Sequence, residues 1–263
     1  MNSTIKQAAS KVPAVTLAFW VVKIAATTLG ETAGDAVSMS MNLGYLVGTA
    51  IFAAIFLLAV GVQIWARQFH PVIYWSTIIA TTTVGTTMAD FADRSLGIGY
   101  AGGSALLLAL LLGSLVLWHR VLGSVSVETV NSPRAEGFYW LTIMFSQTLG
   151  TALGDWTADS AGLGYRGAAL VFLALLAVVV IAYCWTAVSR TALFWMAFIL
   201  TRPLGAVVGD FLDKPRNAGG LALSRYTASA ALLAFIVFCI IALPHRAGQH
   251  LGSGQDLTWR EEG

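Results

Sequence analysis

Charged residues are scarce in this chain. Asp, Glu, Lys and Arg make up 11% of its 263 positions, whereas an ordinary soluble domain carries roughly 25%. Hydrophobic residues take up 57% of the sequence, which indicates an integral membrane protein. The formal net charge is only +2 and the basic residues are scattered, so we expect no nucleic-acid partner.

Cysteine and catalytic motifs are also missing or rare. Cys184 and Cys239 lie inside apolar runs without CxxC spacing, so we expect them to be small core residues. The chain has no HExxH motif, no phosphate-binding glycine loop and no recognisable Ser-His-Asp set. We therefore expect no enzymatic activity, no catalytic residues and no cofactor.

What the chain does contain is a repeat. Four aromatic pairs align in one register: Phe19-Trp20, Tyr74-Trp75, Tyr139-Trp140 and Phe194-Trp195. Ten residues after each Trp comes a glycine: Gly30, Gly85, Gly150 and Gly205. Fifteen residues after it comes an aspartate: Asp35, Asp90, Asp155 and Asp210. A second glycine follows at the ninth position after each aspartate: Gly44, Gly99, Gly164 and Gly219. Four tandem repeats are therefore expected.

Each repeat predicts two membrane-spanning helices. A second apolar run follows every acidic segment, at about 46–66, 101–118, 168–188 and 221–243. Runs near 20 residues are long enough to cross a hydrocarbon core of ~30 Å. We expect an all-α membrane protein with eight transmembrane helices, arranged as four helix hairpins in parallel orientation. The expected units are one membrane domain with repeats at about 13–66, 71–120, 136–188 and 190–245, and a polar tail at 246–263 that we expect to be disordered.

Basic residues predict the orientation. One side of the expected bundle collects Lys6, Lys11, Arg67, Arg120, Arg134, Arg190, Arg246 and Arg260. The other holds Arg94, Arg166, Lys214, Arg216 and Arg225. The positive-inside rule then places both termini in the cytoplasm of a bacterium, around its inner membrane. All four histidines fall at the cytoplasmic ends and not within a span: His70, His119, His245 and His250.

The acidic residues are the candidate metal ligands. If each repeat Trp is an anchor at the cytoplasmic interface, its Asp lies ~22 Å deeper, given the rise of an α-helix. A second oxygen ligand follows on the same helical face: Ser38, Asp93, Asp159 and Asp213. Closer to the middle of the membrane, Thr27, Thr82 and Gln147 predict a polar pathway, with Glu31 one turn beyond Thr27. The candidate metal-binding set is Glu31, Asp35, Asp90, Asp93, Asp155, Asp159, Asp210 and Asp213.

These residues carry a resemblance. The Trp-x9-Gly-x4-Asp pattern resembles that of a bacterial membrane-protein family of unknown function with four tandem repeats, each with two transmembrane segments and a tryptophan. The resemblance covers about residues 13–245, implies the same topology and supplies no activity. The stretch GETAGD at 30–35 is similar in chemistry to the Glu-x-Gly-Asp motifs of manganese and calcium cation/proton exchangers, with one residue more between its acids.

The expected function is transport of a divalent cation. Ionisable residues inside spans are functional hypotheses by default, because each costs roughly 2.5 to 3.5 kcal/mol on insertion scales. Oxygen ligands without thiolate or imidazole suit Mn²⁺, Mg²⁺ or Ca²⁺. We expect proton-coupled export, with Mn²⁺ favoured, an acidic stripe left largely uncompensated, and Lys23 and Arg202 as internal counter-charges.

Two alternatives remain open. In the first, Lys23 and Arg202 bind an anion while the carboxylates carry coupling protons. In the second, the chain is a structural membrane protein whose acids only fix the bundle. The expected partners are the metal cation, protons, the lipid bilayer and, through the glycine-rich faces, a second copy of the chain.

Overall fold

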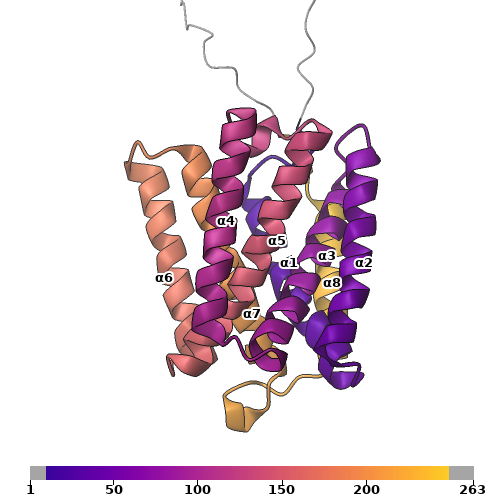
Figure 1. The fold of residues 1–263 in the computed structure, drawn as a ribbon, viewed down its shortest axis with the longest axis vertical. Coiled ribbons are helices and arrows are strands. Elements are labelled where there is room, and N and C mark those ends of the chain that lie inside the picture. Colours follow the sequence, from indigo (N-terminus) through magenta and orange to yellow (C-terminus); the bar gives the residue numbers. More distant parts are fainter. Residues whose placement is uncertain (1–9, 249–263) are drawn as a thin grey trace, which may run out of the picture.

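A computed structural model describes residues 10–248, and this part of the chain is almost entirely helical (Figure 1). It contains eight long helices: α1 (Leu17–Asp35), α2 (Gly44–Trp65), α3 (Pro71–Asp90), α4 (Tyr100–Leu122), α5 (Pro133–Asp155), α6 (Gly164–Trp185), α7 (Arg190–Asp213) and α8 (Arg225–Ala242). A single π-helical turn follows α1, α3 and α5, namely η1 (Ala36–Ser40), η2 (Phe91–Ser95) and η4 (Trp156–Ser160). The expected all-α architecture of eight helices is confirmed.

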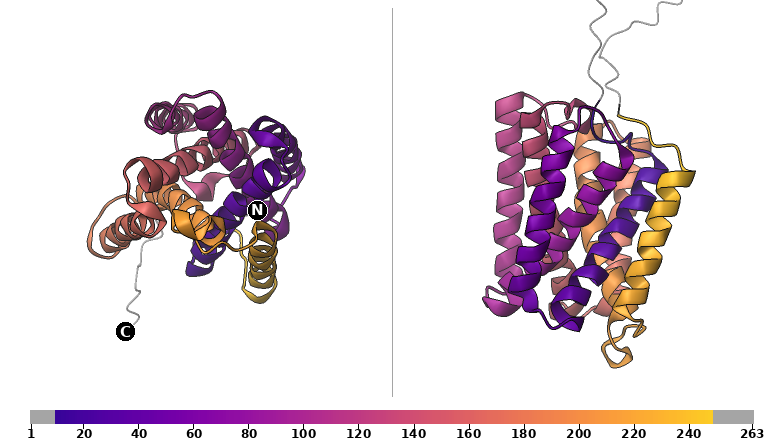
Figure 2. Two further views of the ribbon diagram at one scale, coloured as in Figure 1. Left: turned by 90° about the horizontal axis from the view of Figure 1, so that it is seen from below. Right: turned by 90° about the vertical axis from the view of Figure 1, so that its right-hand side faces the viewer.

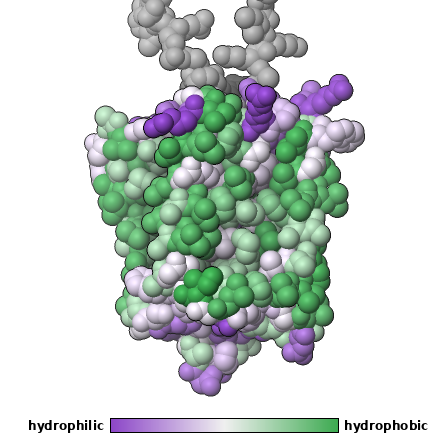
Figure 3. Space-filling view, in the orientation of Figure 1, coloured by the Kyte–Doolittle hydropathy of each residue, from purple (hydrophilic) through white to green (hydrophobic). Residues whose placement is uncertain are grey.

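The helices form an inner and an outer layer (Figure 2). The odd-numbered helices form a closed ring in the order α1, α3, α5 and α7, and the even-numbered helices pack around it. The four outer helices and α7 are long and apolar enough to cross a membrane. The inner helices α1, α3 and α5 carry many threonines and glycines, and the outer helices pack against them. On the face that Figure 3 shows, a broad apolar band lies between hydrophilic ends. The protein is a multi-pass membrane protein.

The helix pairs cross the boundaries of the repeats. We expected each hairpin to pair the two helices of one repeat, but α2 packs along α3, α4 along α5, and α6 along α7. The helix left over, α8, packs along α1, so the last repeat completes the first. This arrangement corrects the expected pairing. It leaves the parallel orientation of the four repeats unchanged.

The second repeat glycine permits the turn that leads to each outer helix. Gly44, Gly99, Gly164 and Gly219 have φ values of 77°, 78°, 63° and 87°. Only a residue without Cβ adopts this left-handed region at low cost. The recurrence of this glycine in every repeat is thereby explained by backbone geometry.

The first repeat glycine allows neighbouring inner helices to touch. A Cβ on Gly30 would overlap Thr82, and one on Gly150 would overlap the Cβ and Cγ of Arg202. A Cβ on Gly85 would lie 3.0 Å from the Cβ of Gln147. In each case the neighbour lies seven residues after the Trp of the next repeat. The four inner helices are therefore parallel and in register around the ring.

We expect Gly150→Ala to lower the thermal stability of the purified protein. The new methyl group has to displace the stem of Arg202 and the Cδ of Pro203, which lies 3.1 Å from its position. Overpacking of this kind costs about 1–3 kcal/mol. Gly113→Ala in α4 is the matched control, because no atom lies within 4 Å of its Cβ position. A melting temperature unchanged in both variants would contradict this account of the inner ring.

Three of the four repeat tryptophans lie in the interior of the bundle, which corrects their interpretation as interfacial anchors. Trp75, Trp140 and Trp195 are buried, and each repeat's first aromatic residue contacts the Trp of the next repeat. The ring centroids are 5.5 Å apart for Phe19 and Trp75, 5.8 Å for Tyr74 and Trp140, 6.3 Å for Tyr139 and Trp195, and 5.8 Å for Phe194 and Trp20. We call these eight residues the aromatic layer. The in-register helices bring all eight rings to one level, where they bury more apolar surface than separate anchors would.

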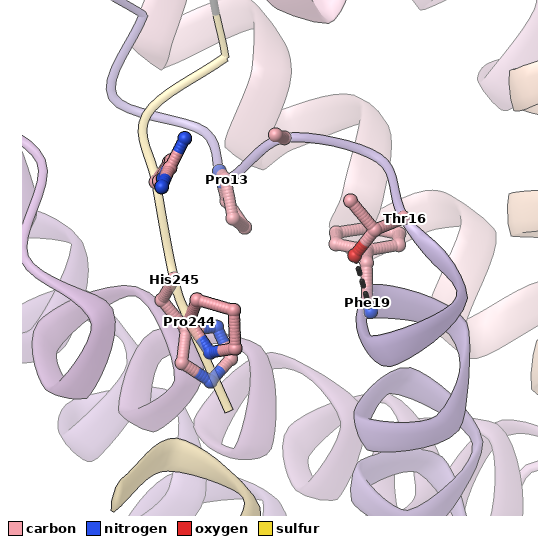
Figure 4. Close-up of a pocket in the computed structure, with 7 residues that line it drawn as sticks. Pro13, Thr16, Phe19, Pro244 and His245 are labelled. Carbon is pink, nitrogen blue, oxygen red and sulfur yellow. Dashed lines mark hydrogen bonds between the residues drawn. The ribbon is translucent and has the colours of Figure 1, made fainter. Parts of the chain in front are cut away.

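The two ends of the described chain meet over the aromatic layer. Pro13 and Ala247 form an antiparallel bridge, and Lys11 contacts Glu136 at 2.6 Å. A cavity of about 240 Å³ lies beside this pairing and is lined by Pro13, Phe19 and His245 among others (Figure 4). Residues 246–248 of the expected polar tail are thus ordered, whereas 249–263 lie outside the described residues.

Candidate cation site

The four repeat aspartates lie together at the end of the inner ring opposite the aromatic layer. Asp35, Asp90 and Asp155 are the last residues of their helices, and Asp210 lies in the last turn of α7. All four are buried. The π-helical turn that directly follows Asp35, Asp90 and Asp155 is a feature found frequently at functional sites. The sequence therefore places one carboxylate from each repeat at one level of the bundle.

Two basic side chains each bridge a pair of these aspartates. Arg94 contacts Asp90 at 2.7 Å and Asp155 at 3.3 Å. Lys214 contacts Asp35 at 2.6 Å and Asp210 at 2.9 Å. Both basic residues lie at the fourth position after a repeat Asp, and only the second and fourth repeats carry a base there. The four repeats share one scaffold, but the basic residues occur in every second repeat only.

Three carboxylates of the described residues form a group that could hold a metal ion. Asp35, Asp210 and Asp213 each offer an oxygen, and these oxygens lie within 4.8 Å of one another. We call these residues the three-acid cluster. The Oδ1 atoms of Asp35 and Asp213 are buried and have no hydrogen-bond partner among the described residues. Two buried carboxylate oxygens thus remain available to a ligand.

Lys214 and Arg225 hold the three-acid cluster together. Arg225 contacts Asp213 at 2.8 Å and Asp35 at 3.5 Å. Burial alone would lower the pKa of Lys214, but Asp210, Asp35 and Asp213 around it raise the pKa above its ordinary value. Lys214 is therefore a charged group that lies among the carboxylates as a bound cation would.

The other predicted acids lie outside the three-acid cluster. Asp90 and Asp155 share Arg94, Asp93 is half-buried against Gly103 of α4, and Asp159 is exposed. The expectation that the acids are largely uncompensated is wrong, since each repeat Asp has an ion pair with Arg94 or Lys214. The spacing of four residues from Asp90 to Arg94 and from Asp210 to Lys214 was a sequence signal for these pairs. Arg225 had no such signal.

Glu31 lies deeper in the bundle, in a network centred on Arg202. The Nη1 and Nη2 atoms of Arg202 both donate to Oε2 of Glu31 at 3.1 Å. Nη2 also donates to the hydroxyls of Thr86, at 2.6 Å, and Thr151. One guanidinium from α7 therefore bonds to α1, α3 and α5. The structure places Arg202 beside Glu31, as the expected counter-charge role requires.

The expected polar pathway lies on the other side of this network, nearer the aromatic layer. Thr27 donates to the carbonyl of Ile24 at 2.8 Å, whereas the side chains of Thr82 and Gln147 have no partner among the described residues. The Nζ of Lys23 has none either and lies 4.1 Å from the ring centre of Phe198. The inner ring is thus polar along most of its length.

A pocket of about 330 Å³ opens beside the three-acid cluster. Its lining includes Asp213 and Arg225, Ser40 at the end of η1, and Pro215 and Leu223 from the connection between α7 and α8. This connection, residues 214–224, is much longer than the corresponding segments 41–43, 96–99 and 161–163. The fourth repeat therefore shapes the approach to the cluster.

Comparison with known protein families gives one result. Residues 18–69, 73–123, 138–189 and 193–247 each match the model of a family described as Repeat of Unknown Function (DUF347). No curated protein and no solved structure matches the chain.

Proposed function

The chain belongs to the DUF347 repeat family, whose function is unknown, and we propose that it is a proton-coupled transporter of divalent cations, with Mn²⁺ as the favoured substrate. The observation that carries the proposal is the three-acid cluster of Asp35, Asp210 and Asp213, with buried oxygens that lack a partner. Carboxylate oxygens in such a group suit a hard divalent cation.

In this proposal, Lys214 and Arg225 exchange with the divalent cation as partners of the carboxylates. Without substrate, their charges neutralise Asp35 and its neighbours. An arriving divalent cation takes over the carboxylate oxygens and displaces the Lys214 ammonium. Protons compete with the cation for the same oxygens, which couples cation release to proton binding. The bound cation is the substrate, and the protein needs no cofactor.

Charge distribution supports the proposed orientation in a bacterial inner membrane, with both termini in the cytoplasm. On the side of the three-acid cluster, Arg94, Lys214 and Arg225 are engaged by acids, which leaves Arg166 and Arg216. On the termini side, the described basic residues include Arg67, Arg120, Arg134, Arg190 and Arg246. The positive-inside rule then favours this side as cytoplasmic. Export is the proposed direction, with the cluster near the outer face.

Flux into proteoliposomes tests the proposal. We expect Mn²⁺ uptake and opposite proton movement, followed together with a cation-sensitive dye and a pH dye. Asp35→Asn keeps the side-chain shape but removes one ligand charge, so cation flux should fall at least roughly tenfold, which corresponds to the loss of ~1.4 kcal/mol of binding.

Asp159→Asn is the matched control, because Asp159 is an exposed acid at the same end of the molecule. Cation flux through this variant should stay at the wild-type level. Absence of cation flux across Mn²⁺, Mg²⁺ and Ca²⁺, with both variants folded, would refute the proposal. An equal loss of cation flux in Asp35→Asn and Asp159→Asn would refute the assignment of the site to the three-acid cluster.

A further inference from the structure

A second group of buried polar side chains lies between the aromatic layer and the Glu31–Arg202 pair. Four of its side chains have atoms with no hydrogen-bond partner among the described residues: Nζ of Lys23, Oγ1 of Thr82, Nε2 and Oε1 of Gln147, and Nε of Arg202. All four side chains are fully buried. Buried polar groups of native proteins are almost always hydrogen-bonded, so each exception needs an explanation.

Register places these four residues at neighbouring levels of the four inner helices. Lys23 lies three residues after its repeat Trp, and Thr82, Gln147 and Arg202 lie seven residues after theirs. The glycine contacts keep the helices in register, so the group occupies two successive turns of the ring. Ser146 is also unpartnered, but it lies one turn after Thr142, which bonds to Ser114 of α4, and so belongs to the contact with the outer layer.

Basic side chains outnumber acidic ones in this region. Lys23 and Arg202 are the two bases, and Glu31 is the acid that contacts Arg202. Lys23 has no carboxylate partner among the described residues and contacts only the face of Phe198 by its ammonium, at 4.1 Å. An unpaired ammonium in a water-excluding interior is costly. The unpartnered atoms are donors, apart from the Gln147 carbonyl oxygen and the acceptor capacity of the Thr82 hydroxyl.

We propose that this group is a binding site for a small monovalent inorganic anion of the size of chloride. One such anion accepts from the Lys23 ammonium, the Arg202 Nε–H, the Gln147 amide and the Thr82 hydroxyl, and its negative charge stabilises the ammonium form of Lys23. The glycines limit its size, because Gly30 and Gly85 lie where even one added methyl group would collide with Thr82 or Gln147. This close packing favours a small anion over an organic acid.

The anion site is separate from the three-acid cluster, and this inference does not depend on the proposed function. It uses Lys23, Thr82, Gln147 and Arg202, none of which belongs to the cluster. The anion supplies the counter-charge for a Lys23 ammonium inside the bundle.

Binding of radiolabelled chloride to the purified, detergent-solubilised protein tests this site. We expect saturable binding that bromide and nitrate compete for and gluconate does not. Thermal unfolding at constant ionic strength should show the same selectivity, with a higher melting temperature in chloride than in gluconate, because a ligand that binds only the folded state stabilises it.

Two variants assign the binding to this group. Lys23→Met keeps the length of the side chain and should abolish saturable chloride binding. Gln147→Leu removes one donor and should weaken binding roughly ten- to hundredfold. Arg120→Gln is the control for loss of a positive charge, since Arg120 is exposed at the end of α4, and it should bind chloride as the wild type does.

Three results would overturn the inference. One is the absence of saturable chloride binding by the folded wild type. The second is chloride binding by Lys23→Met and Gln147→Leu that equals that of Arg120→Gln. The third is competition by gluconate as effective as that by bromide. Loss of cation flux in Asp35→Asn with intact chloride binding would leave both sites supported, because the two experiments report on different residues.

Discussion

Replacing Arg202 by methionine is expected to destabilise the bundle strongly. The substitution leaves Glu31 buried without its cationic partner and removes the donors that bond to Thr86 and Thr151. Breaking a buried ion pair by removing one partner costs about 3–5 kcal/mol. The free energy of unfolding in detergent, followed by the intrinsic fluorescence of the buried tryptophans, measures this loss.

A double-mutant cycle separates the ion pair from simple packing. In Glu31→Gln/Arg202→Met the buried carboxylate is gone, so we expect part of the lost stability to return relative to Arg202→Met alone. Arg67→Met, at an exposed position outside the helices, is the control and should stay within about 0.5 kcal/mol of the wild type. A double variant that is no more stable than Arg202→Met would show that Arg202 acts through packing and not through Glu31.

The periodic features of the fold could be read from the sequence. The positions of Trp75, Gly85 and Asp90 have equivalents at the same spacing in every repeat. In the structure these positions form three levels of the inner ring. The aromatic residues form one end, the glycines form the helix contacts, and the aspartates form the other end. A periodic sequence on parallel helices dictates this stacking because every α-helix rises by the same distance per residue.

The relations between repeats could not be read in the same way. Nothing within one repeat indicates whether its outer helix packs on its own inner helix or on the next, so the pairing of α2 with α3 was missed. The burial of Trp75 has the same origin. A lone tryptophan near a helix end favours the membrane interface, and only the neighbouring repeat, which supplies Phe19, makes the interior the better place.

The charge balance of the site also depends on contacts between distant residues. Lys214 reaches Asp35 across 179 positions of sequence, and Arg225 reaches the same carboxylate from the start of α8. A sequence shows the acids and the bases, but it does not show which of them meet. The eight candidate ligands were therefore predicted as one stripe. The structure divides six of them among the three-acid cluster, the Arg94 bridge and the Arg202 network, and leaves half-buried Asp93 and exposed Asp159 outside these groups.

Replacing Lys214 by methionine is expected to strengthen the binding of a divalent cation to the three-acid cluster. In the wild type, the Lys214 ammonium lies 2.6 Å from Asp35 and 2.9 Å from Asp210, and under the proposed function Mn²⁺ has to displace it. Without this competitor we expect Mn²⁺ to bind at least roughly tenfold more tightly, a gain of ~1.4 kcal/mol. Isothermal titration of the purified protein with Mn²⁺ measures the change.

The same variant should be less stable than the wild type in a chelator and should regain stability when Mn²⁺ is added. Its Asp35 and Asp210 carboxylates repel each other until a cation binds between them, and a ligand that binds the folded state raises its stability. Adding Asp35→Asn to Lys214→Met should abolish this Mn²⁺-dependent gain, whereas Arg216→Met, which removes an exposed base from the same connection, should change neither quantity.

Arg94→Met provides the sharpest comparison, because it removes the equivalent bridge from Asp90 and Asp155. That pair has no third carboxylate corresponding to Asp213 among the described groups of possible metal ligands, so Mn²⁺ should restore less of its stability. If Mn²⁺ stabilises neither variant, Lys214 is a structural tie and not a displaceable counter-ion. If it stabilises both equally, the cation recognises any pair of repeat aspartates, and the assignment of Asp213 as a ligand fails.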